Sequence, residues 1–157
     1  MTIIHYICHM SFTQLFYHII FSTKNRRQLI RPGIERDVYS LIYHISRKDG
    51  VGVFRIGGMP DHVHMLVSIP ADIAVATYVK NLKRQASLAI RQAGLISGWD
   101  GWQNGYGCFS YSFKDLSMIR HYIVNQKEHH KAVSFRDEYR ALLIEAGVSP
   151  DEPYFPK

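Results

Sequence analysis

Two histidines, His62 and His64, are separated by one residue in a stretch that alternates as a β-strand does. Because successive strand side chains point to opposite faces, the two imidazoles share one face, about 7 Å apart along the strand. The apolar Val63 and Met65 then share the other face, which suits packing against helices. Imidazole is the commonest metal ligand in proteins, so the pair indicates a candidate site for a metal ion.

The same pair has other interpretations. Nine histidines in 157 residues make a chance His-x-His pattern unsurprising, and histidines on a solvated sheet face have the same spacing. A nucleotide hydrolase with three alternating histidines needs a third one where Leu66 stands. A two-motif phosphoesterase needs a second His-x-Thr or His-x-Ser on another predicted strand, and none is evident. From the spacing alone, a metal site and a surface pair both stay open.

A second candidate group is Tyr122, which lies four residues before Gln126 in a stretch with apolar residues at helical spacing. Residues four apart share a face of an α-helix, so the two side chains are predicted to lie together, with His129 and His130 following. The simplest interpretation is a half-buried tyrosine that hydrogen-bonds a surface glutamine. The alternative is a nucleophile beside a metal ligand, and both stay open at this point.

The chemistry of the second interpretation is specific. A tyrosine hydroxyl has a pKa of about 10, so it attacks a phosphodiester only if its proton is removed or its pKa is lowered. A divalent ion held by two imidazoles and the amide oxygen of Gln126 would polarise the phosphate and stabilise the departing 3′ oxygen. Nitrogen ligands combined with amide and phosphate oxygens suit Mg²⁺ or Mn²⁺.

The elements that must position these groups follow from periodicity and turn residues. A turn is predicted over 57–61, and Ser112 with Asp115 resembles a capping box. Strands are predicted over 12–23, 51–56, 62–69 and 108–112. A first helix is predicted to open at residues 31–33 and to close at Gly50, and further helices are predicted over 73–93, 113–129 and 135–146. The order β-α-β-β-α-β predicts an α+β, ferredoxin-like fold, in which two helices cover one face of a four-stranded antiparallel sheet, with additional C-terminal helices. Many functions occur on this fold, so function depends on the site.

Composition places the chain among ordinary globular domains. Hydrophobic residues make up 46% and charged residues 20%, which excludes a disordered chain. A net charge of +6 favours a polyanionic partner. Cys8 and Cys108 have no metal-like or redox-like spacing, and the apolar N-terminal stretch, interrupted by histidines, has no signal-peptide pattern. We therefore expect a cytoplasmic protein without a membrane segment.

Several motifs, taken together, resemble the single-tyrosine transposases of the HUH superfamily, of the IS200 and REP-associated types. Their order and spacing carry the resemblance, which covers about residues 11–147. The matching motifs are His62-Val63-His64, the Tyr-x-x-x-Gln of Tyr122 and Gln126, and the segments 17–27, 79–83 and 102–107. The resemblance implies a transposase domain over 11–149, preceded by an extension over 1–10 and followed by a tail over 150–157.

The resemblance also implies a mechanism. Tyr122 would attack a single-stranded DNA phosphodiester to give a 5′-phosphotyrosine and a free 3′ hydroxyl, and a later attack by a 3′ hydroxyl would rejoin the strand. His62, His64 and Gln126 would hold the divalent ion. Such enzymes act as homodimers, often with sites shared between subunits, and recognise hairpins at the ends of a mobile element. The expected setting is a prokaryotic cell, with chromosomal or replicating DNA as the target.

Five basic residues are candidates for contacts with DNA phosphates, because phosphate neutralisation is a natural use of clustered cations. They lie at the end of the first predicted strand and on the second long helix: Lys24, Arg26, Arg27, Lys83 and Arg84. Solvated surface charge would look the same, so both interpretations stay open.

Two competing functions remain beside the transposase. One is a non-catalytic or domesticated nucleic-acid-binding protein of the same fold. The other is a metal-dependent phosphodiesterase that uses water in place of tyrosine. A covalent protein–DNA adduct distinguishes the three, because only a tyrosine nucleophile forms one.

Overall fold

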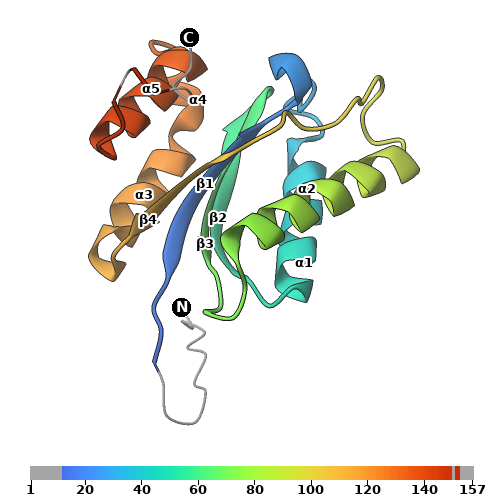
Figure 1. Ribbon diagram of the computed structural model, residues 1–157. Coiled ribbons are helices and arrows are strands. Elements are labelled where there is room, and N and C mark those ends of the chain that lie inside the picture. The colour runs from blue at the N-terminus through green and yellow to red at the C-terminus, as the bar shows by residue number, and fades with distance from the viewer. Residues whose placement is uncertain (1–11, 150, 153–157) are drawn as a thin grey trace. The chain divides into compact units, whose positions relative to one another are not determined.

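The computed structural model describes residues 12–149 and 151–152. Along the chain it contains β1 (Phe16–Ser22), η1 (Lys24–Arg26), α1 (Glu35–Lys48), β2 (Gly52–Met59), β3 (His62–Ser68), α2 (Val75–Gln92), β4 (Gly107–Tyr111), η2 (Phe113–Asp115), α3 (Leu116–Val124), α4 (Gln126–His129) and α5 (Phe135–Glu145) (Figure 1). The chain divides into two compact units, one ending at Val124 and the other beginning at Asn125.

The strands of the first unit form one antiparallel sheet. Its order is β2-β3-β1-β4, so β3 is paired on both sides, with β1 and β2. This is the strand order of the ferredoxin-like arrangement, and the predicted α+β fold class is confirmed. The central place of β3 fixes the backbone of His62 and His64 through two hydrogen-bonded neighbours.

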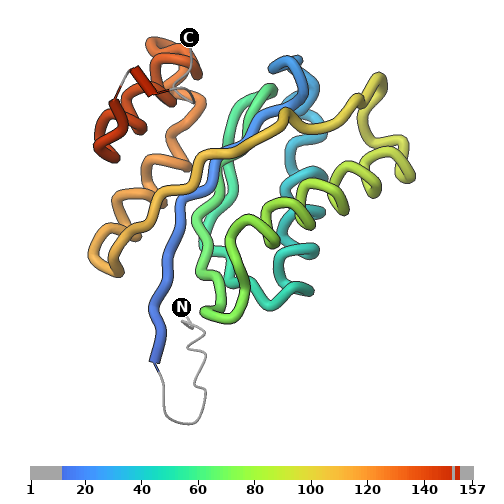
Figure 2. The backbone as a smooth tube through the Cα atoms, viewed as in Figure 1, coloured from blue at the N-terminus to red at the C-terminus, as the bar shows by residue number. Residues whose placement is uncertain are grey.

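Helices α1 and α2 cover one face of the sheet (Figure 2). The alternation in β3 works as predicted, because Val63, Met65 and Val67 are fully buried in the cluster under these helices. Val38 and Ile42 of α1 and Val79 and Leu82 of α2 belong to the same cluster.

Helix α3 covers the opposite face, which carries the two histidines. Its apolar stripe, Leu116, Ile119 and Ile123, packs with Phe16 and Leu66 in a second cluster. The predicted capping box before α3 is confirmed: the Ser112 side chain accepts from the backbone N–H of Asp115, and the Asp115 carboxylate accepts from the backbone N–H of Ser112 at 3.0 Å.

The hairpin between β2 and β3 is tighter than predicted. Gly57 and Gly58 belong to β2 and pair with His64 and Val63, so the predicted turn over 57–61 is too long and begins only after Met59. A Cβ on Gly57 would lie 2.8 Å from the backbone carbonyl oxygen of Ile123. The glycine is therefore in the strand because α3 passes too close for any side chain.

The predicted helix over 113–129 is wrong in one respect. It consists of a 3₁₀ turn and α3, which ends at Val124, and a new helical turn begins at Gln126 after Asn125 (φ −91°, ψ 12°). Asparagine competes for backbone hydrogen bonds and favours helix ends, which accounts for the break. Tyr122 and Gln126 therefore do not share the face of one continuous helix.

The structure does not test the predicted boundaries of the domain. The predicted extension over 1–10 lies outside the described residues, and the predicted extents of the domain and the tail stay predictions. Within residues 12–149 and 151–152, no helix has the length and apolar character needed to cross a membrane.

Candidate active site

His62 and His64 lie side by side on the α3 face of β3. One nitrogen of each ring lies within 4.8 Å of the other, and the ring centroids are 5.1 Å apart. The strand thus brings together the two imidazoles that its alternation predicts on one face. A spacing of this size allows both rings to bind one ion, as in the metal site expected from the sequence.

The first imidazole is oriented by a neighbouring carboxylate. His62 Nδ1 lies 2.7 Å from Asp61 Oδ1, and Arg26 donates to Asp61 Oδ2 at 3.1 Å. Burial alone would raise the pKa of Asp61, but hydrogen bonds and charges from His62 and Arg26 hold that pKa below its usual value. An ionised carboxylate only accepts, so Nδ1 of His62 donates and Nε2 carries the lone pair that a metal ion needs.

The second imidazole is oriented by another histidine. His64 Nδ1 lies 2.8 Å from Nε2 of His18, a buried residue of β1, and the planes of the two rings differ by 24°, with centroids 5.1 Å apart. When His64 Nδ1 donates this bond, its Nε2 also carries the lone pair. Asp61 therefore leaves Nε2 of His62 as a ligand, and His18 does the same for His64 in the tautomer whose Nδ1 donates.

Sequence reasoning assigned His18 no chemistry. Strand alternation identifies its face within β1, but the side chain that it meets depends on the pairing register of β1 with β3, which periodicity does not give. In the observed register His18 is opposite Leu66, and Ile20 is opposite His64.

Tyr122 packs against His64 and His18. Its ring centroid lies 5.9 Å from His64 and 5.9 Å from His18, with ring planes nearly perpendicular to both. The side chain is half-buried. Helix α3 thus places the predicted nucleophile beside one predicted ligand, within a single unit of a single chain.

Gln126 belongs to the second unit, where its amide has a defined orientation. Gln126 Nε2 donates to Glu138 Oε1 at 2.8 Å, and His130 Nε2 lies 3.0 Å from Glu138 Oε2. Since a carboxylate only accepts, the amide nitrogen must face Glu138, and the amide oxygen lies on the other side. Sequence reasoning missed Glu138, because a glutamate in the exposed-looking pattern of α5 gives no signal of this contact.

The predicted DNA-binding residues differ in their surroundings. Arg27 pairs with Asp100 at 3.2 Å and donates to the carbonyl of Gly98 at 3.0 Å. Lys83 donates to the carbonyls of Gln103 and Gly105, at 2.6 and 2.7 Å, and burial lowers its pKa.

Lys24 and Arg84 are exposed, whereas Arg26 is the residue that holds Asp61. Three of the five cations thus hold carboxylates or loop carbonyls of the same chain. Their use on DNA stays a prediction.

Comparison with known proteins adds the family. A family model described as "Transposase IS200 like" matches residues 11–126, which include His62, His64, Tyr122 and Gln126. The ISDra2 transposase TnpA of Deinococcus radiodurans is 29% identical over 120 residues, covering 73% of this chain and 86% of the relative. The transposase for insertion sequence element IS200 of Salmonella typhimurium is 30% identical over 120 residues, with 73% and 78% covered.

Solved structures share the fold. A crystal structure of a Deinococcus radiodurans transposase aligns with a TM-score of 0.60 at 24% identity, covering 75% of this chain and 95% of the other. A REP-associated tyrosine transposase bound to a REP hairpin aligns with a TM-score of 0.58 at 17% identity, covering 76% and 70%. The matched residues contain the whole sheet, α3 and the paired histidines, and the chain belongs to the IS200-like transposase family.

Proposed function

We propose that this transposase cuts and rejoins single-stranded DNA with Tyr122 as its nucleophile. The observation that supports this most is the packing of the Tyr122 ring against His64 and His18, 5.9 Å from each. A tyrosine in a structural role needs no pair of oriented imidazoles beside it. The two competing functions have no comparable observation in their favour.

The reaction exchanges one phosphodiester for another. Tyr122 Oη forms a bond to the phosphorus, the bond from phosphorus to the 3′ oxygen breaks, and the DNA 5′ end stays on the tyrosine. The phenol loses one proton and the departing 3′ oxygen gains one, so the step is balanced. In the second half, a 3′ hydroxyl attacks the phosphotyrosine and releases Tyr122, and no energy-rich cofactor is consumed.

His62, His64 and Gln126 are proposed to hold a divalent ion, Mg²⁺ or Mn²⁺. The donor set fits: the contact with Asp61 leaves a lone pair on Nε2 of His62, and the contact with His18 leaves one on Nε2 of His64 when His64 Nδ1 donates. Glu138 orients the amide of Gln126. When bound, the ion would polarise the scissile phosphate and stabilise negative charge on the departing oxygen. Tyr122 supplies the attacking oxygen, and packing against the two histidines limits its motion.

The substrate is proposed to be a hairpin-bearing strand at the end of a mobile element, bound by a homodimer. A relative of the same fold is known bound to a REP hairpin, and the charge of +6 suits a polyanion. The contact between Tyr122 and His64 within one chain favours a site in which both come from the same subunit.

The test is a denaturing gel of labelled hairpin-bearing single-stranded DNA incubated with the protein and Mg²⁺ or Mn²⁺. We expect a covalent protein–DNA band that is absent in Tyr122→Phe and retained in Tyr43→Phe, an exposed tyrosine of α1 that serves as the matched control. Cleavage without an adduct would favour the phosphodiesterase, and binding without cleavage the non-catalytic protein. An adduct retained in Tyr122→Phe would exclude this tyrosine as the nucleophile.

A further inference from the structure

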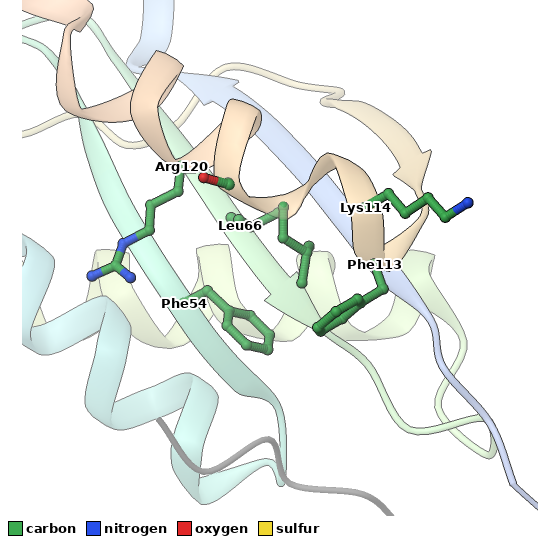
Figure 3. A pocket seen from close by; sticks show the side chains of 7 residues that line it. Phe54, Leu66, Phe113, Lys114 and Arg120 are labelled. Carbon is green, nitrogen blue, oxygen red and sulfur yellow. The ribbon is translucent and has the colours of Figure 1, made fainter.

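A pocket of about 540 Å³ opens on the α3 face of the sheet (Figure 3). Its volume lies in the range of small-molecule sites. All residues that line it belong to the unit that ends at Val124: Phe54 of β2, Leu66 of β3, and Phe113, Lys114, Leu116, Ser117 and Arg120 of η2 and α3.

The interior of the pocket is apolar and aromatic. Leu66 and Leu116 are buried, and the rings of Phe54 and Phe113 both pack against Phe16, with centroids 5.6 and 6.4 Å away. In Figure 3 the rings of Phe54 and Phe113 lie near each other, next to the Leu66 side chain. Phe113 is 49% exposed, so a flat ligand in the pocket would cover apolar surface that water now contacts.

A cation lies at each end of this apolar interior. Figure 3 shows Arg120 on the side of Phe54 and Lys114 on the side of Phe113. Among the described residues that line the pocket, none is acidic. A nucleotide within a strand has the complementary pattern, since a flat base is flanked by one phosphate on its 5′ side and another on its 3′ side.

The pocket lies close to the candidate active site. Leu66 is two residues from His64 on the same face of β3, about 7 Å along the strand. Arg120 and Tyr122 are two residues apart on α3 and therefore point to opposite flanks of that helix. One helix thus presents the nucleophile on one flank and this pocket on the other.

We propose that the pocket binds an unpaired nucleobase of the DNA strand, with the flanking phosphates on Lys114 and Arg120. The inference rests on the proposed function, because it takes single-stranded DNA as the substrate. It adds a place on the protein surface where a base close to the cleaved phosphate is held. Phe54 and Phe113 supply stacking surface that tolerates any base, so the pocket contributes affinity and placement more than sequence recognition.

The test uses the Tyr122→Phe protein, which keeps the pocket and forms no adduct. Unpaired oligonucleotides with 5-iodouracil at successive positions are irradiated, and the cross-linked peptides are mapped by mass spectrometry. We expect cross-links to Phe54 or Phe113 from one short window of the strand. Phe113→Leu should weaken binding about tenfold through lost stacking, whereas Tyr43→Leu on the far face should not.

Charge gives a second measurement. Arg120→Gln should reduce the salt dependence of binding by about one phosphate contact, and Arg47→Gln on α1 should leave it unchanged. Circular dichroism checks that each variant folds. We expect Phe113→Leu to fold, because the Phe113 side chain is partly exposed.

Cross-links confined to other residues, or wild-type affinity in Phe113→Leu, would overturn the proposal. A changed oligomeric state of Phe113→Leu in sedimentation, with unchanged DNA affinity, would assign the pocket to a second copy of the chain and overturn it as well. The adduct assay tests the nucleophile separately. An adduct in the wild type without these cross-links would contradict only base binding in the pocket, and these cross-links without a wild-type adduct would contradict only the assignment of Tyr122 as the nucleophile.

Discussion

His18 and Asp61 each hold Nδ1 of one imidazole, by a 2.8 Å contact to His64 and a 2.7 Å contact to His62. They differ in chemistry, because an ionised carboxylate only accepts whereas an imidazole donates or accepts. The contact with Asp61 therefore favours the His62 tautomer in which Nδ1 carries the hydrogen. The tautomer of His64 is chosen jointly by His18 and by whatever binds Nε2, so metal binding itself selects the competent form.

Substitution of His18 tests this role. His18→Phe keeps an aromatic ring but removes the acceptor for His64 Nδ1, and we expect Mn²⁺ affinity to fall about 10- to 100-fold. His18→Gln places an amide oxygen near the former Nε2 and should restore most of that affinity. The measurement is Mn²⁺ binding by electron paramagnetic resonance without DNA. Equal Mn²⁺ affinity in the wild type and His18→Phe would show that His18 does not act through His64.

At the scale of elements, the close packing of α3 on β2 requires that Gly57 has no side chain. A Cβ on Gly57 would meet the Ile123 carbonyl at 2.8 Å, and backbone on both sides prevents an easy adjustment. Since Tyr122 precedes Ile123, any displacement of the helix moves the nucleophile relative to His64. The position of Tyr122 is thus set partly by the edge strand β2.

We expect Gly57→Ala to lower the free energy of unfolding by about 1–3 kcal/mol, as overpacking does. Adduct formation should fall further than the loss of folded protein explains. Gly33→Ala is the control, because a Cβ there meets nothing within 4 Å. Urea denaturation and the adduct rate measure the two effects. Unchanged stability and adduct rate in Gly57→Ala would mean that α3 does not need this close approach.

The sequence predicted the elements well where one periodicity governs a segment. Alternation over β3 correctly placed Val63, Met65 and Val67 under two helices and His62 and His64 on the other face. The glycines at 57 and 58 predicted a turn, but both belong to β2. Local turn preference does not reveal that Gly57 is required by the close approach of α3.

A local helix break and contacts between residues distant in sequence account for the rest. The helical pattern through Tyr122 and Gln126 continued across Asn125, although the backbone there breaks the helix. His18 and Glu138 were missed for a different reason, since each meets its partner across a distance in sequence that periodicity does not cover.

At the scale of the whole molecule, the net charge of +6 is not all available to DNA. Lys83 and Arg84 are neighbours on α2 with opposite tasks: Lys83 donates to two carbonyls of the loop before β4, and Arg84 is exposed. Of the two neighbours, Lys83 thus holds a loop of its own chain, and Arg84 is the one proposed to contact a DNA phosphate.

Arg84→Gln should reduce the slope of log affinity against log salt for single-stranded DNA by about 0.7, the value for one phosphate contact. Lys83→Gln should leave the slope nearly unchanged and lower the unfolding midpoint by about 2–4 °C. Fluorescence anisotropy over a salt series and thermal denaturation measure the two. An equal decrease of this slope in both variants would mean that Lys83 leaves its loop to bind DNA.

The hydrogen bond from Gln126 to Glu138 has a consequence for comparing members of the family. The family match ends at Gln126, so the glutamine lies inside the shared region and its partner on α5 lies outside it. A protein shortened to the shared region would keep each of the four predicted site residues, yet it would lack the carboxylate to which the Gln126 amide donates. The partner that orients the amide of Gln126 thus lies outside the residues that the family model matches.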